Sequence, residues 1–101
     1  MKVMIAGAGK LGLSVTEALL SGGNEITLLD TNEALIQKVN NRLDVFTMVA
    51  DAEKIDVLTK LKIKDYDLVI ACADRDEKNI LIAKFAKELG CRQAIASVRS
   101  P

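Results

Sequence analysis

A glycine-rich segment near the amino terminus has the residue types and spacing to hold phosphates. Residues 7–12 read Gly-Ala-Gly-Lys-Leu-Gly, a G-x-G-x-x-G pattern, and Asp30 follows 18 residues after the last of these glycines. The pattern follows an apolar run typical of a strand and opens a stretch typical of a helix, which is the setting in which it binds dinucleotides. There Gly7 allows a tight turn, Gly9 lets the backbone approach a pyrophosphate, and Gly12 lets the helix pack on the sheet. The alternative is a tight turn that holds no ligand.

The residues around this turn bear on which ligand it accepts. The expected helix start offers unpaired N–H groups and a positive dipole end to phosphates, and the Lys10 ammonium either reaches a phosphate or is a surface cation. Asp30 is placed to accept hydrogen bonds from ribose hydroxyls and would repel a 2′-phosphate, which the uncharged Thr31 and Asn32 do not offset. The sequence therefore disfavours NADP and leaves NAD, NADH, ATP and ADP. The cofactor-binding residues expected here are Gly7, Ala8, Gly9, Lys10, Leu11, Gly12, Asp30, Thr31 and Asn32.

Further candidates follow the later apolar runs. Asp51 lies where an adenine edge would be, and is otherwise an ordinary turn aspartate. Asp76 suits the start of a helix and would also offer a carboxylate to a divalent cation. Cys72 either approaches a cofactor or is a small buried apolar residue, and Arg99 is either a phosphate or carboxylate partner or a surface cation. The candidates at these strand ends are Asp51, Ala52, Cys72, Ala73, Asp76, Asn79 and Arg99.

Short apolar, β-branched runs alternate with amphipathic stretches, which predicts βαβ units on a parallel sheet. Strands are expected at residues 2–6, 25–29, 45–49, 68–72 and 93–98, and helices at 10–21, 33–40, 53–61 and 76–89. Right-handed crossovers with one reversal of winding predict a Rossmann-like doubly wound sheet of order 3-2-1-4-5 in a three-layer αβα fold, with its ligand crevice between strands 1 and 4. The residues of the first helix expected to pack on the sheet are Leu11, Val15, Ala18 and Leu19.

Composition excludes several classes of function. The 101 residues carry 14 Lys and Arg against 14 Asp and Glu, a balance that argues against a nucleic-acid-binding protein. There is no His, which excludes His-ligand metal sites and Ser-His or Cys-His catalysis. The two cysteines are expected to be reduced thiols, and no apolar run approaches the roughly 18 residues of a membrane span. We expect a single soluble, cytoplasmic domain over residues 1–101.

The whole chain resembles the N-terminal domain of TrkA-type potassium-uptake proteins, the RCK or KTN family. The resemblance is carried by residues 1–12, by Thr-Leu-Leu-Asp-Thr-Asn at 27–32, by the Asp76-Glu77-x-Asn79 motif and by the Arg-x-Pro ending at 99–101. Two residues depart from the family pattern: Ala50 stands where a glycine is usual, and Leu13 where several relatives carry Arg. The resemblance places nucleotide contacts at Gly7, Gly9, Lys10, Gly12, Asp30, Asn32, Asp51, Ala52 and the backbone of 71–73.

The resemblance further implies a regulatory domain with no catalytic residues. Such domains form cytoplasmic rings that bind NAD(H) or ATP/ADP and set the opening of a membrane potassium pore, so a homo-oligomer and a potassium-translocating membrane subunit are the expected partners. The start at Met1 suggests a separate peripheral subunit at the inner face of the membrane. The sixth strand and dimerisation helix usual in the family are missing after Pro101, which suggests a truncated domain or a minimal member.

Two other functions remain open at this point. The first is the cofactor-binding half of an NAD-dependent oxidoreductase, which would need a second domain and a proton donor; the only tyrosine, Tyr66, is expected at the wrong end of its strand. The second is a free-standing nucleotide or redox sensor with a different partner.

Overall fold

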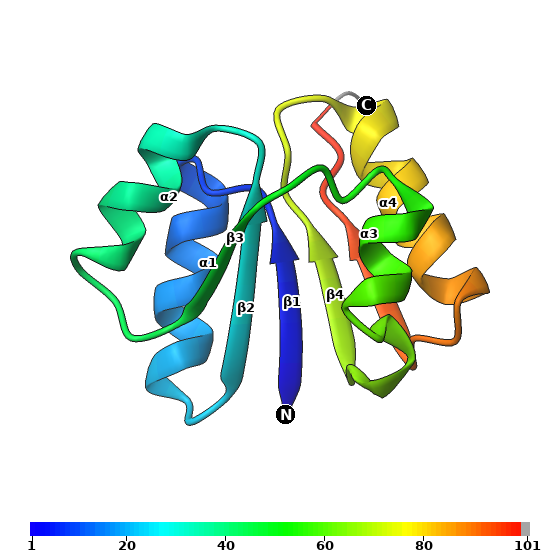
Figure 1. Cartoon of the computed structure of the whole chain (residues 1–101), viewed down its shortest axis with the longest axis horizontal. Coiled ribbons are helices and arrows are strands. Elements are labelled where there is room, and N and C mark those ends of the chain that lie inside the picture. The colour runs from blue at the N-terminus through cyan, green and yellow to red at the C-terminus, as the bar shows by residue number, and fades with distance from the viewer. Residues whose placement is uncertain (100–101) are drawn as a thin grey trace.

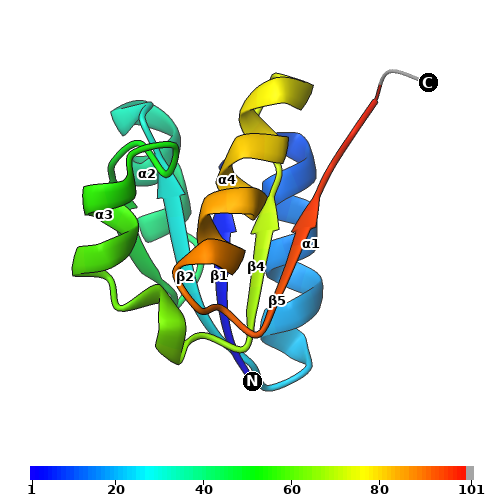
Figure 2. The same cartoon turned by 90° about the vertical axis from the view of Figure 1, so that its right-hand side faces the viewer.

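A computed structural model describes residues 1–99 as one sheet with helices on both faces (Figures 1 and 2). The strands are β1 (Lys2–Ala6), β2 (Glu25–Asp30), β3 (Phe46–Val49), β4 (Leu68–Ala71) and β5 (Gln93–Ala96). The helices are α1 (Lys10–Ser21), α2 (Glu33–Asn40), α3 (Ile55–Lys60) and α4 (Asp76–Glu88), with a short 3-10 helix η1 (Ile63–Asp65). All strand pairs are parallel and the order is β3-β2-β1-β4-β5, so the predicted fold and strand order are confirmed.

Both faces of the sheet are buried, which explains why its central strands are apolar without interruption. Along β1, Val3 and Ile5 pack in the cluster that contains the residues of α1 and α2. Met4 and Ala6, which alternate with them, pack in the cluster that contains the residues of α3 and α4. The two helix layers therefore reach the carboxyl edge of the sheet from opposite faces.

The predicted packing face of α1 was partly wrong. Leu11 and Ala18 are exposed, and the helix instead turns Gly12 and Thr16 to the sheet, both buried. A Cβ atom on Gly12 would overlap the carbonyl oxygen of Gly7, so this close contact with the preceding turn sets which face of the helix is inward. The residues that pack inward are Gly12, Leu13, Val15, Thr16, Leu19 and Leu20.

Several element ends differ from the predicted ones. Helix α3 begins at Ile55 and not at residue 53, because a turn closed by Asp51 precedes it: Oδ1 of Asp51 accepts a hydrogen bond from the Glu53 N–H at 2.9 Å, and its carbonyl accepts one from the Lys54 N–H at 3.1 Å. Strand β4 ends one residue early, at Ala71, and β5 ends at Ala96. Of the Arg-x-Pro ending, residues 100 and 101 lie outside the described residues.

The helix ends follow the sequence signals more closely. The Asn32 side chain caps α2 by accepting a hydrogen bond from the Leu35 N–H at 3.2 Å, as its position predicts. After α4, Gly90 adopts a φ of 102°, a left-handed conformation that favours glycine. None of the helices formed by residues 1–99 is both long and apolar enough to cross a membrane.

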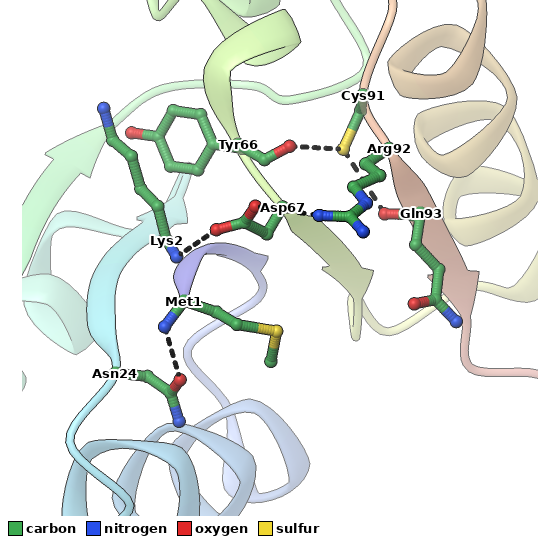
Figure 3. A network of polar contacts seen from close by, with 8 residues as sticks. All are labelled: Met1, Lys2, Asn24, Tyr66, Asp67, Cys91, Arg92 and Gln93. Atoms are coloured by element: carbon green, nitrogen blue, oxygen red, sulfur yellow. Dashed lines mark hydrogen bonds and ion pairs between the residues drawn. The ribbon is translucent and has the colours of Figure 1, made fainter.

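Polar contacts tie the strands together at the amino-terminal edge of the sheet (Figure 3). Asp67, just before β4, accepts a hydrogen bond from the Lys2 N–H at 2.8 Å. Next to it, the buried Tyr66 shares a hydrogen bond between its hydroxyl and that of Thr27 at 2.9 Å, while its carbonyl accepts one from the Cys91 thiol at 3.5 Å. Tyr66 thus belongs to the edge opposite the carboxyl ends of the strands.

Candidate functional site

A cavity of about 540 Å³ opens at the carboxyl edge of the sheet, above β1, β2 and β4. Its position matches the crevice in which ligands of doubly wound sheets bind. Most of the residues proposed from the sequence line it, namely Gly7, Gly9, Lys10, Leu11, Asp30, Thr31, Asn32, Ala52, Cys72, Ala73 and Arg99. The remaining candidates do not line it, namely Ala8, Gly12, Asp51, Asp76 and Asn79.

The three glycines of the turn differ in backbone conformation and in the space available for a Cβ atom. Gly7 has a φ of 120°, and a Cβ atom there would lie 2.5 Å from the carbonyl oxygen of Cys72. Gly12 presses against Gly7, as described above. Gly9 is different, because its φ is −75° and a Cβ atom there would meet nothing within 4 Å. The fold therefore requires glycine at positions 7 and 12, whereas the space beside Gly9 belongs to the cavity that it lines.

Gly9 is also the N-cap of α1, so this helix begins at the cavity with no side chain on its cap residue. The first backbone N–H groups of a helix lack partners within the helix, and with the helix dipole they attract anions. Lys10, exposed beside them, adds a positive charge. The turn can therefore hold a phosphate group through backbone N–H groups and one ammonium.

Asp30 shapes the opposite side of the turn. Its Oδ2 accepts a hydrogen bond from the Ala8 N–H and its Oδ1 one from the Asn32 N–H, both at 2.7 Å. A carboxylate oxygen can accept more than one hydrogen bond, so this half-buried side chain can still accept from a ligand hydroxyl. Asp30 thus combines a structural contact with a position on the cavity wall.

Apolar residues also line the cavity, and of these the sequence had assigned only Ala52 to the site. They are Leu29, Leu35, Ala50, Ala52 and Ile82, from four different segments. Such a wall suits the flat face of a nucleobase. The helical spacing of Leu35 and Ile36 indicates which face of α2 packs on the sheet, but not that Leu35 lines the crevice.

Asp51 and Lys78 form an ion pair at the side of the cavity nearest α4, with Nζ 3.5 Å from Oδ1. Lys78 lines the cavity and Asp51 does not. This reverses what the sequence suggested, since Asp51 was the expected ligand contact and Lys78 was not a candidate. The helix start at 76–79 carried the only available signal, because a lysine there is unfavourable to the helix dipole without a partner.

The loop between β4 and α4 is held from behind by Asn79, which is completely buried. Its Oδ1 accepts a hydrogen bond from the Ala73 N–H at 2.6 Å, and its Nδ2 donates to the carbonyls of Ala73 and Ser97, each at 3.0 Å. Asp76 and Arg99 add a second tie, because Oδ1 of Asp76 accepts a hydrogen bond from the Arg99 N–H at 3.0 Å. These contacts fix the part of the cavity wall formed by Ala73.

Arg99 and Cys72 complete this wall. The Arg99 guanidinium donates to the Ala73 carbonyl at 3.3 Å and still lines the cavity. Cys72 is buried, and burial raises the pKa of its thiol above the ordinary value. Both cysteines are free thiols, and residues 1–99 contain no group of three or more His, Cys, Asp or Glu placed to hold a metal ion.

The chain also resembles solved structures. It superposes with a TM-score of 0.77 and 25% identity on the Kef CTD of Shewanella denitrificans in its AMP-bound form, covering 94% of this chain and 57% of that one. The NAD(P)-binding domain of an exopolyphosphatase-related protein from Archaeoglobus fulgidus gives a TM-score of 0.86 at 20% identity, over 98% of this chain and 74% of that one. At that identity the second likeness concerns the fold alone.

Sequence relatives agree with the structural likeness. The chain is 30% identical over 101 residues to a Trk system potassium uptake protein TrkA homolog of Methanothermobacter thermautotrophicus, and 33% identical over 107 residues to the Trk system potassium uptake protein TrkA of Mycobacterium tuberculosis. Each alignment covers 100% of this chain and 47% or 46% of the relative, so the chain spans about half the length of these curated relatives. The model of the TrkA-N domain matches residues 3–101. Because that match extends over nearly the whole chain and the relatives align along all of it, the chain belongs to the TrkA-N family.

Proposed function

We propose that this domain binds an adenine nucleotide, NAD(H) or ATP/ADP, in the crevice and thereby regulates a membrane potassium transporter or channel. The open space beside Gly9 carries the first half of this proposal. The fold does not need glycine at this position. A phosphate that approaches the start of α1 needs it, because a side chain on residue 9 would occupy the place of the phosphate.

Each part of an adenine nucleotide has a matching group in the crevice. The backbone N–H groups at the start of α1 would hold the phosphates, and Asp30 would accept hydrogen bonds from the ribose hydroxyls. The apolar wall that includes Leu35 and Ala52 would cover the base. A 2′-phosphate would face the Asp30 carboxylate, so NADP is disfavoured. The AMP in the related Kef CTD supports this choice of ligand class.

The second half of the proposal, regulation of potassium transport, is supported by the curated relatives, which are named as Trk potassium uptake proteins. A nucleotide shifts a conformational equilibrium only through its different affinities for the two states. We therefore propose that this domain works at the inner face of the membrane, in a homo-oligomer attached to a potassium-translocating subunit, and that nucleotide binding favours one arrangement of the oligomer.

We further propose that the domain is not an enzyme. The chain has no histidine and its one tyrosine lies at the opposite edge of the sheet, so of the usual proton donors of a dehydrogenase only lysine is present at the crevice, and the curated relatives are named as potassium uptake proteins. A nucleotide or redox sensor with another partner would use the same crevice. Co-purification with a potassium-translocating membrane protein distinguishes that alternative from the proposed one.

The Gly9→Ala variant tests nucleotide binding. Calorimetric titration of the wild-type protein with NAD, NADH, ATP, ADP and NADPH, with and without magnesium, identifies the ligand and shows whether a divalent cation joins the phosphates. Gly9→Ala is expected to fold normally and to lose at least tenfold in affinity. Gly22→Ala, at the other end of α1 with a φ of −82°, is the matched control and keeps wild-type affinity. Unchanged affinity in Gly9→Ala would contradict the proposal.

A further inference from the structure

Lys78 occupies an electrostatically unfavourable place unless it has an anionic partner. It lies in the first turn of α4, where the positive end of the helix dipole repels a cation. Its side chain is only 18% exposed, and its ammonium lies 3.5 Å from the carboxylate of Asp51, which is 30% exposed. Asp51 belongs to the connection between β3 and α3, which crosses the carboxyl edge of the sheet in Figure 1. The ion pair therefore joins two segments at the rim of the cavity.

Asp51 is itself held in place. Its Oδ1 accepts a hydrogen bond from the Glu53 N–H at 2.9 Å, within the turn that precedes α3. Its side chain does not line the cavity, whereas that of Lys78 does. A fixed carboxylate behind a lysine that faces the cavity is an arrangement that positions the ammonium. Asp51 thus acts on the cavity through Lys78.

Lys78 and the glycine turn line the same cavity but belong to helix layers on opposite faces of the sheet. Helix α4 covers the face of the sheet that buries Met4, and α1 covers the face that buries Val3. A phosphate at the start of α1 would therefore have backbone N–H groups on one side and the Lys78 ammonium across the cavity. Because Asp30 and Asp74 also line this cavity, an anionic ligand gains from a cation there, and the low exposure of Lys78 limits screening by water and salt.

We propose that Lys78 is a phosphate-binding residue of this site and Asp51 its positioning residue. This inference rests on the proposed nucleotide-binding function and deepens it. Through Lys78, α4 would contribute to selectivity for charged ligands, so that the crevice favours phosphorylated ligands over the uncharged nucleoside. Release of Asp51 is not required, since an ammonium donates three hydrogen bonds and can contact both groups.

The test compares ADP with adenosine as probes. The measured quantity is the ratio of their dissociation constants. Calorimetric titration gives the constant for ADP, and competition of adenosine against ADP gives the constant for adenosine. Lys78→Met is expected to lower this preference for ADP about tenfold, the effect of one charge-assisted hydrogen bond. Lys78→Arg keeps the preference within about threefold, since it retains the charge. Lys84→Met, an exposed lysine on the same helix, is the matched control and leaves the ratio unchanged.

The ratio separates a ligand contact from a structural role. If Lys78 only ties α4 to the Asp51 turn, Lys78→Met weakens ADP and adenosine equally, the ratio stays at its wild-type value, and the inference is overturned. Asp51→Asn is expected to lower the ratio about threefold, because the ammonium remains but is no longer held. A wild-type protein that binds none of the adenine nucleotides would instead overturn the proposed function, and this inference with it.

Discussion

The carboxylate of Asp30 accepts a hydrogen bond from the backbone N–H of Ala8 at 2.7 Å, joining the end of β2 to the glycine turn after β1. The N–H of Asn32 donates to the other carboxylate oxygen at the same distance. One side chain therefore fixes the shape of the glycine turn and the start of the segment that leads into α2. A residue expected from the sequence to contact only a ribose also supports the protein around it.

Asp30→Ala is therefore expected to lower both affinity and stability. Two backbone N–H groups lose their acceptor, which costs about 1–3 kcal/mol of unfolding free energy. The affinity for adenine nucleotides also falls, because the ribose hydroxyls lose the Asp30 carboxylate as acceptor. Urea unfolding and calorimetric titration measure the two effects. Asp44→Ala, at an exposed position between α2 and β3, is the control and changes neither. Wild-type stability in Asp30→Ala would show that the two hydrogen bonds contribute nothing.

Asn79→Ala is expected to destabilise the protein by about 2–4 kcal/mol, because it removes three part-buried hydrogen bonds: the Ala73 N–H and the Ser97 carbonyl lose the Asn79 side chain as partner, and the Ala73 carbonyl keeps only Arg99. Chemical unfolding measures the loss, and hydrogen exchange at the Ala73 amide, which should become faster, locates it. Gln37→Ala, on the exposed side of α2, is expected to change stability by less than about 0.5 kcal/mol. Slow exchange at Ala73 in the Asn79 variant would contradict this account of the loop.

Cys72 is expected to resist alkylation at neutral pH. Burial raises the pKa of its thiol, so the folded protein holds the neutral thiol at a pH where an exposed cysteine has begun to ionise. Iodoacetamide labelling, followed residue by residue with mass spectrometry, should accelerate as pH rises above the ordinary thiol pKa of about 8.5. Denatured protein, in which the thiol is exposed, serves as the reference for unhindered labelling.

The same shift has a consequence for stability. Over this pH range the unfolded chain loses the thiol proton before the folded protein does, so the contribution of Cys72 to stability declines as pH rises through the unfolded pKa. Because Cys72 lines the cavity, a bound nucleotide should also slow its labelling. Rapid labelling of the folded protein at pH 7 would contradict the burial and would instead favour a thiol-based redox sensor.

The parallel order of the strands could be predicted because chain connectivity and handedness leave few arrangements for alternating strands and helices. The turn at residues 7–12 could be predicted because its chemistry is local. The inward face of α1 could not, since the apolar pattern favours Leu11 and Ala18, whereas the contact between Gly12 and the preceding turn sets the orientation.

The polar pairs of the site could not be predicted from the sequence, because they also depend on contacts between distant parts of the chain. Lys78 and Asp51 are 27 residues apart, and only the folded chain brings them within 3.5 Å. Asn79 was a reasonable candidate for ligand binding, because the sequence predicts that this polar residue lies at a helix start near the crevice. One of its three hydrogen bonds is donated to the carbonyl of Ser97, the residue after β5, and no local pattern reports that contact.

The different constraints on the three glycines bear on how this family can diverge. Replacement of Gly7 or Gly12 disturbs the backbone itself, so any descendant that folds this way must keep both. Position 9 is free of that constraint and is restrained only by what enters the cavity. A lineage that stopped sensing nucleotides could accept a side chain there with little harm. We therefore expect position 9 to distinguish related domains that still bind a ligand from those that have lost it.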